Sequence, residues 1–190
     1  MYRGSCIAGV GMNTRQKITA GLVAFLLLLP LLWYALAYLP YVGLIRTLAT
    51  QGANSIQGAD PLLRPLVLAD QTPAQVRSYA MRQAYASLVF DNNRGSAISW
   101  HANTTLWYLA SYLHLRDGEM LGLWAQCAFG CGHGLSQASL QYLHKDVHLL
   151  SGREAANLVA AVKSPVRYVP GSSANERRTD ELLARLRVQK

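Results

Sequence analysis

The hydrophobic pattern is dominated by one long apolar run near the start of the chain. No charged side chain occurs from Ile18 to Ile45, and these residues include the stretch AGLVAFLLLLPLLWYALAYL. Such a run is long enough to cross a bilayer core, which needs about 20 apolar residues. The pattern therefore predicts a transmembrane helix over residues 18–45. Aromatic residues, which favour the lipid–water boundary, lie toward its C-terminal end: Trp33, Tyr34, Tyr38 and Tyr41.

Later in the chain, apolar residues recur at the three- and four-residue spacing of helices, and no segment alternates as a strand does. Thr72 followed by Pro73 is typical of a helix start, and Ser151 with Glu154 fits a capping box. The fold class we expect is all-α, with one N-terminal transmembrane helix followed by a compact helical domain. The expected helices of that domain cover about 73–88, 104–116, 119–129, 135–143, 152–163 and 175–188. In the second of these, the residues expected to be buried are Leu106, Leu109, Ala110 and Leu113.

Turn-forming residues divide the remainder of the chain. Glycine, asparagine, serine and proline interrupt any sustained period over residues 46–72, so this segment is interpreted as a linker. The sequence GCGHG from Gly130 to Gly134 predicts a tight loop. The predicted organisation is a cytoplasmic tail over 1–17, the anchor over 18–45, the linker over 46–72 and a helical domain over 73–190.

The residues that flank the apolar run predict its orientation. Arg3, Arg15 and Lys17 precede it without any acidic residue, so the N-terminus is expected in the cytoplasm and the rest of the chain beyond the cytoplasmic membrane. This makes the protein a single-pass membrane protein with an extracytoplasmic domain. A cleaved signal peptide is the alternative, because Ala35-Leu36-Ala37 offers a small-x-small cleavage site.

Charge narrows the classes of partner. Three of the 18 basic residues precede the apolar run, which leaves 15 Lys and Arg against 10 Asp and Glu in the part beyond it. A mild positive excess suits anionic lipid headgroups or a substrate that carries a pyrophosphate. No basic block with interleaved aromatic residues occurs, so nucleic acid is not expected as a partner.

Several residues suggest chemistry on their own. Cys127 and Cys131 could form a disulfide in an oxidising compartment, or could be two small buried residues. His133, His144 and His148 could gather around a metal, although solvated or capping histidines are the simpler interpretation. Ser136 lies in a stretch similar to a nucleophile elbow, but no strand is predicted before it.

A longer pattern resembles a known family. The segment from Glu119 to Pro170 reads EMLGLWAQCAFGCGHGLSQASLQYLHKDVHLLSGREAANLVAAVKSPVRYVP. It resembles the C-terminal half of the glycosyltransferase family 51 domain, the peptidoglycan transglycosylase of penicillin-binding proteins and their monofunctional relatives. The matching elements are Glu119-Met120-Leu121 with Leu123-Trp124, Phe129-Gly130, Gly134 through Ser139, Tyr142-Leu143-His144-Lys145 and Leu150-Ser151 with Glu154-Ala155-Ala156. The resemblance implies a lysozyme-like helical domain, truncated here.

A second match lies upstream, in GSAISWHANTTLW from Gly95 to Trp107. It is similar to the family's donor-site motif G-S-T-I-T-Q-Q-L-A-K-N-L-F, with Trp100 and His101 in place of the two glutamines. The resemblance implies that substrate binds at Gly95, Ser96, Ser99 and His101. Arg94, Arg82 and Arg116 could offer positive charge, with Arg94 near the pyrophosphate, but none of the three stands at a position matched by the family.

The family's catalytic pieces are poorly matched. Its E-D-x-x-F motif supplies a glutamate as general base, whereas the chain beyond the anchor has no glutamate before Glu119. Asp91 is the only acidic residue near the donor-site motif and is the candidate base. No cofactor is implied, although a divalent metal could stabilise the departing pyrophosphate.

Three functions therefore stay open. In the first, the protein is a divergent glycosyltransferase that acts on a lipid-linked disaccharide pyrophosphate in cell-wall synthesis and uses Asp91 as base. In the second, it is a pseudoenzyme, a membrane-tethered module that binds the lipid-linked precursor, a glycan strand or a cell-wall synthase without turnover. The residues favour the second. In the third, it is a structural anchor protein unrelated to the cell wall.

Overall fold

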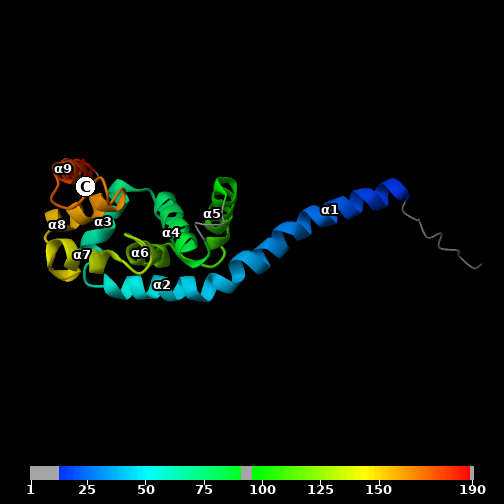
Figure 1. The fold of residues 1–190 in the computed structure, drawn as a ribbon, viewed down its shortest axis with the longest axis horizontal. Coiled ribbons are helices and arrows are strands. Elements are labelled where there is room, and N and C mark those ends of the chain that lie inside the picture. Colours follow the sequence, from blue (N-terminus) through cyan, green and yellow to red (C-terminus); the bar gives the residue numbers. More distant parts are fainter. Residues whose placement is uncertain (1–12, 91–95, 189–190) are drawn as a thin grey trace, which may run out of the picture. The chain divides into compact units, whose positions relative to one another are not determined.

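The computed structural model describes residues 13–90 and 96–188, and all regular secondary structure in this part of the chain is helical (Figure 1). An isolated bridge between Ala128 and Gly130 is the exception to helix and turn there. The all-α prediction is thus confirmed for the described ranges. In chain order the helices are α1 Thr14–Trp33, η1 Tyr34–Tyr38, η2 Leu39–Tyr41, α2 Val42–Ser55, α3 Asp60–Asp70, α4 Pro73–Leu88, α5 Ala97–Ser111, α6 Asp117–Gln126, α7 Leu135–Leu143, η3 Val147–Leu149, α8 Gly152–Val162 and α9 Ser173–Val188.

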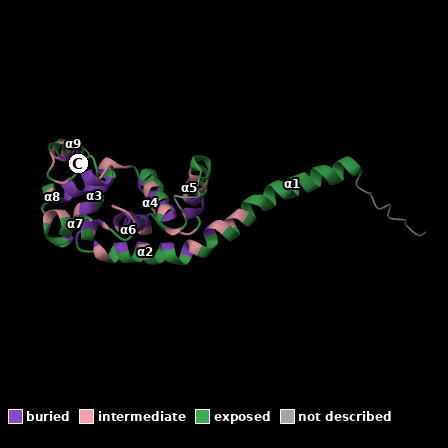
Figure 2. Ribbon diagram, viewed as in Figure 1, coloured by how far each residue is buried: buried purple, intermediate pink, exposed green. Residues whose placement is uncertain are grey.

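The chain divides into two units, one ending at Pro40 and the other beginning at Tyr41. The first contains α1, which starts at a capping box between Asn13 and Gln16 and continues into the π-helical turn η1. The residues of α1 are exposed from its start to Leu32, as the colouring in Figure 2 shows, and Trp33 is half-buried. The helical stretch from Thr14 to Ser55 is long and apolar enough to cross a membrane.

The second unit is a helical domain with its own core. Buried apolar residues come from α2, α3, α4, α6 and α8, and every residue from Ala155 to Val162 on α8 is buried. Helix α2 packs along α6, α4 packs against both α5 and α6, and α9 packs on α3 and α8. Figure 2 shows buried residues on these helices where they face the inside of the domain. A domain of this kind can bury enough apolar surface to hold its shape.

Local capping chemistry fixes several helix starts as expected. The Thr72 side chain accepts a hydrogen bond from the Gln75 backbone N–H while the Gln75 side chain accepts one from the Thr72 N–H, which begins α4. Ser151 and Glu154 form the predicted capping box of α8. In both places the first turn of the helix has its free N–H groups satisfied by side chains close in sequence.

The segment 46–72 is not a linker in the structure. Most of α2 and all of α3 lie within it, and α3 buries Leu63, Leu66 and Val67 in the core. Of the turn formers that suggest a linker, Gly58 lies in the short connection over 56–59, whereas the others belong to the helices: Gly52, Asn54 and Ser55 to α2, and Pro61 and Pro65 to α3. Pro65 stays inside α3 at an exposed position, one turn after the helix begins.

Helix α5 also differs from its prediction. It begins at Ala97, with the Ser96 side chain accepting a hydrogen bond from the Ser99 N–H, and ends at Ser111. Its buried residues are Trp107, Ala110 and Ser111, while Leu109 and Leu113 are 54% and 74% exposed. The expectation that the leucines are buried is therefore wrong. Apolar residues occur all around this helix, so spacing alone could not identify its inner face.

Asp117-Gly118 begins a helix instead of ending one. The Glu119 carboxylate accepts a hydrogen bond of 2.7 Å from the Arg116 N–H and so caps the start of α6. An acidic residue in the first turn of a helix also interacts favourably with the helix dipole. The expected loop after α6 is present, and its Gly130 and Gly132 have φ angles of 103° and 104°, which glycine adopts readily.

Candidate functional site

Three residues of the donor-site-like motif lie at the start of α5. Ser96 caps the helix, Ser99 accepts a hydrogen bond from the Asn103 side chain, and His101 is exposed. The other predicted site residues, Asp91, Arg94 and Gly95, lie outside the described residues. The Ser96 hydroxyl thus caps the start of α5, and the Ser99 hydroxyl bonds to the side chain one turn further along the helix. Both hydroxyls have a structural role.

The described part of the chain holds a groove of about 440 Å³ on a different side of α4 from α5. It is bounded by the C-terminal end of α3, one side of α4 and the C-terminal end of α8. Its lining is polar and comprises Asp70, Gln71, Gln75, Ser78, Tyr79, Arg82 and Lys163. None of Ser96, Ser99 and His101 contributes to it. The groove is a polar concave site, and it lies where three helices converge.

The one carboxylate in the groove wall is already neutralised by the protein. Asp70 has a side chain only 4% exposed and forms an ion pair with the guanidinium of Arg178, whose Nε donates to the Ala160 carbonyl at 3.2 Å. The Arg185 guanidinium lies 3.9 Å from the same carboxylate. Asp70 is therefore part of a buried structural ion pair that joins α3 to α9.

The uncompensated charge of the groove is positive. Among the described residues neither Arg82 nor Lys163 has an ion-pair partner, and both side chains line the groove. Arg82 comes from α4, and its guanidinium carbon lies 5.9 Å from the centre of the Tyr79 ring. Lys163 is the residue at which α8 ends. Two cations on facing helices, with amide and hydroxyl groups between them, suit an anion that also carries hydroxyl groups.

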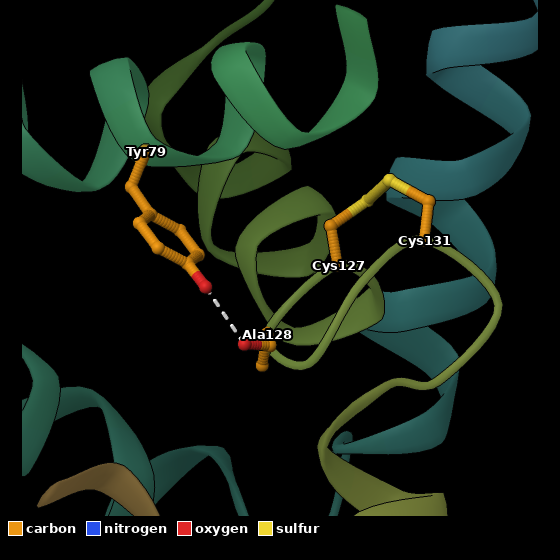
Figure 3. The surroundings of a disulfide bond; sticks show 4 residues. All are labelled: Tyr79, Cys127, Ala128 and Cys131. Atoms are coloured by element: carbon orange, nitrogen blue, oxygen red, sulfur yellow. Dashed lines mark hydrogen bonds between the residues drawn. A yellow bond between two sulfur atoms is a disulfide. The ribbon is translucent and has the colours of Figure 1, made fainter. Parts of the chain in front are cut away.

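Tyr79 lines the groove and also contacts the loop that follows α6, residues 127–134. Its hydroxyl donates a hydrogen bond of 2.8 Å to the Ala128 carbonyl, as Figure 3 shows. Burial raises the pKa of Tyr79 above its ordinary value, and hydrogen bonding to Gln83 partly offsets that effect. The phenol therefore stays protonated and acts as a donor that fixes the loop to α4.

A disulfide closes the same loop. Cys127 and Cys131 are bonded, with their Cα atoms 4.0 Å apart (Figure 3). The sequence left this pairing open, and the structure resolves it in favour of the bridge. Ala128, the acceptor of the Tyr79 hydrogen bond, lies within the closed loop, so this hydrogen bond joins the disulfide loop to Tyr79, a lining residue of the groove.

The other residues with candidate chemistry have structural partners. The Ser136 hydroxyl donates to the Ser55 carbonyl at 2.9 Å and so joins α7 to α2. His144 ends α7 in a left-handed conformation with φ 53°. The described residues contain no group of three or more side chains able to hold a metal.

Glu154, which matches the family's E-A-A element, is likewise engaged. Its carboxylate accepts hydrogen bonds from Lys145 and from the Ser151 backbone and hydroxyl, and these lower its pKa to about 2. A carboxylate that stays ionised to such a low pH is a poor proton acceptor at neutral pH. Glu154 is therefore a capping residue and not a candidate base.

Sequence reasoning noted Arg82 only as a possible positive charge and missed Lys163. The two residues are far apart in the chain, and no local pattern places the end of α8 opposite α4.

Comparison of the chain with protein-family models, with curated proteins and with solved structures finds no match.

Proposed function

We propose that this protein is a membrane-anchored module, similar to the glycosyltransferase family 51 domain, that binds a lipid-linked disaccharide pyrophosphate in the groove between α4 and α8. In this proposal its role in cell-wall synthesis is binding, without polymerisation. The observation that carries the proposal is the pair of cations, Arg82 and Lys163, in a groove whose carboxylate is already paired.

The chemistry of the ligand matches the lining. A pyrophosphate carries charge that Arg and Lys bind through charge-assisted hydrogen bonds. Gln71, Gln75 and Ser78 supply donors and acceptors for sugar hydroxyls beside those cations. A lipid tail on the ligand agrees with an apolar N-terminal helix that is long enough to cross a membrane.

Binding without turnover is favoured because the groove lacks a carboxylate placed to act as a base. Glycosyl transfer of this kind needs a group that takes a proton from the acceptor hydroxyl. Asp70 is held by Arg178 and so is committed to the fold. The remaining candidate, Asp91, belongs to the segment outside the described residues, and an active enzyme that uses it is the competing function.

Binding to the full-length protein in detergent micelles tests the proposal, with a fluorescent lipid-linked disaccharide pyrophosphate as probe. The double variant Arg82→Ala/Lys163→Ala is expected to lose about ten- to a hundredfold in affinity for each cation removed, since a charge-assisted hydrogen bond contributes roughly 1.5–3 kcal/mol. The matched control is Arg177→Ala/Arg187→Ala, which removes the same charge from exposed positions on α9. Equal affinity in both double variants would contradict the groove as the binding site.

Turnover is measured in the same preparation by following glycan polymer on a gel. The proposal expects no polymer from the unaltered protein. Polymer that disappears in Asp91→Asn would instead establish an enzyme with a relocated base. Absence of both binding and polymer would leave the structural anchor as the function.

A further inference from the structure

One side of α5 and of the turn that follows it exposes a stripe of large apolar side chains, interrupted by Ala102 and Thr105, that no described helix covers. Ile98 is 82% exposed, and Leu109 and Leu113 are the exposed leucines already described. Leu106 and Tyr112 are exposed on the same side, at helical spacing from Leu109. The opposite side of α5 packs on α4, where the Tyr85 and Trp107 rings lie 5.2 Å apart.

This stripe differs from the scattered exposed leucines that soluble proteins tolerate. From Ala97 to Leu113 the chain contains no Asp, Glu, Lys or Arg, so the exposed side of α5 has no charge to hold it in water. Apolar stripes of this length on one helix mark contact with a protein partner or with lipid.

Two contacts place α5 next to the point where the apolar N-terminal run ends. The Trp107 ring lies 5.5 Å from the ring of Tyr41. The Arg46 guanidinium donates a hydrogen bond of 2.9 Å to the His114 carbonyl, just beyond the C-terminal end of α5. Tyr41 lies within the uncharged run, and Arg46 is the first charged residue after it. The C-terminal part of α5 thus lies beside the beginning of α2, where the uncharged run ends.

We infer that the exposed side of α5 lies in the membrane interface, with Ile98, Leu109 and Leu113 among the acyl chains. Arg46 and Arg116 flank the C-terminal end of the stripe and are exposed, which suits contact with anionic headgroups. Tyr108 and Tyr112, whose hydroxyls lie 2.8 Å apart, provide the amphipathic rings that favour this depth. The inference rests on the membrane anchor of the proposed function but not on its ligand.

The test measures the depth of single fluorescent labels in full-length protein reconstituted into vesicles of phosphatidylethanolamine and phosphatidylglycerol. In a Cys6→Ser background the two remaining native cysteines are joined in the disulfide. The fluorophore NBD therefore attaches only at the introduced cysteine, Leu109→Cys or Leu113→Cys. The control positions are Val166→Cys and Leu149→Cys, which are 92% and 73% exposed and belong to other parts of the domain. Because all four positions are exposed, labels there leave the core intact, and circular dichroism verifies the fold.

The inference expects nitroxide lipids to quench the Leu109 and Leu113 labels several-fold more strongly than the control labels, with the opposite order for aqueous iodide. Iodide quenching at Leu109 equal to that at Val166 would overturn it. Protection of the Leu109 label from both quenchers would also overturn it, since a protein partner or second copy would then cover α5. If lipid quenches the Leu109 and Leu113 labels but the protein does not bind the lipid-linked disaccharide pyrophosphate, the result would contradict the groove as a binding site and would leave the membrane contact of α5 supported.

Discussion

Gly52 of α2 and Gly122 of α6 are packed backbone against backbone. A Cβ atom built on Gly52 would overlap the Gly122 carbonyl oxygen, and one built on Gly122 would overlap the carbonyl oxygen of Ala49. The two helices can approach this closely only because neither position has a side chain. This pair joins the helix that begins the domain to the helix that precedes the disulfide loop.

Substitution of alanine at Gly122 is therefore expected to destabilise the domain by about 1–3 kcal/mol, because the atoms it would meet are backbone and cannot move aside cheaply. The control is Gly118→Ala on the same helix, where an added Cβ would meet nothing within 4 Å. Thermal unfolding in detergent measures both. An equal melting temperature for the two variants would contradict the close packing of α2 on α6.

The buried ion pair between Asp70 and Arg178 gives a second prediction. Asp70→Asn leaves the Arg178 guanidinium buried without a carboxylate, and breaking a buried pair in this way costs about 3–5 kcal/mol. Asp60→Asn breaks a solvent-exposed pair with Arg64 on the same helix and is expected to cost about 0–1 kcal/mol. Chemical denaturation of the two variants gives the comparison, and a smaller loss for Asp70→Asn than for Asp60→Asn would refute this role.

The hydrogen bond from Tyr79 to Ala128 is expected to contribute to the stability of the groove wall. Tyr79→Phe removes the donor and leaves the Ala128 carbonyl unsatisfied, which costs about 1–3 kcal/mol. Hydrogen exchange of the loop from Cys127 to Gly134, followed by mass spectrometry, is expected to become faster in this variant. Unchanged exchange in the loop would show that the disulfide alone holds it.

Glu154 makes part of the stability depend on pH. Its folded-state pKa of about 2 lies below the ordinary value of 4.5, so its contribution is fully present above pH 4.5 and is lost as the pH falls toward 2. The melting temperatures of the unaltered protein and Glu154→Gln are expected to differ at pH 6 and to converge near pH 2. A constant difference across this range would mean that the ionised carboxylate does not stabilise the start of α8.

Local signals predicted what depends on neighbours in sequence. The starts of α4 and α8 follow from Thr72 and Ser151, whose capping partners lie three residues away. The apolar helix near the N-terminus follows from a run without charge. These features could be predicted because the interactions that produce them are short in range.

What depends on tertiary packing was not predicted. The segment before α3 contains glycine, and its sequence alone suggests a linker. In the structure this segment is helix α2, which packs against α6 with Gly52 at the contact. The inner face of α5 is selected by the aromatic contacts of Trp107 and not by leucine spacing. Arg82 and Lys163 line the same groove although α4 and the end of α8 are far apart in the sequence. No local pattern could indicate this pairing.

The bridge between Cys127 and Cys131 has a consequence for how the domain is delivered. A disulfide forms and persists in oxidising compartments and is reduced in the cytosol. Chains whose domain has crossed the membrane would carry the closed loop, and chains inserted the other way round would keep two free thiols. For the membrane-anchored protein proposed above, the redox state of this one pair would therefore record the side of the membrane on which each molecule folded.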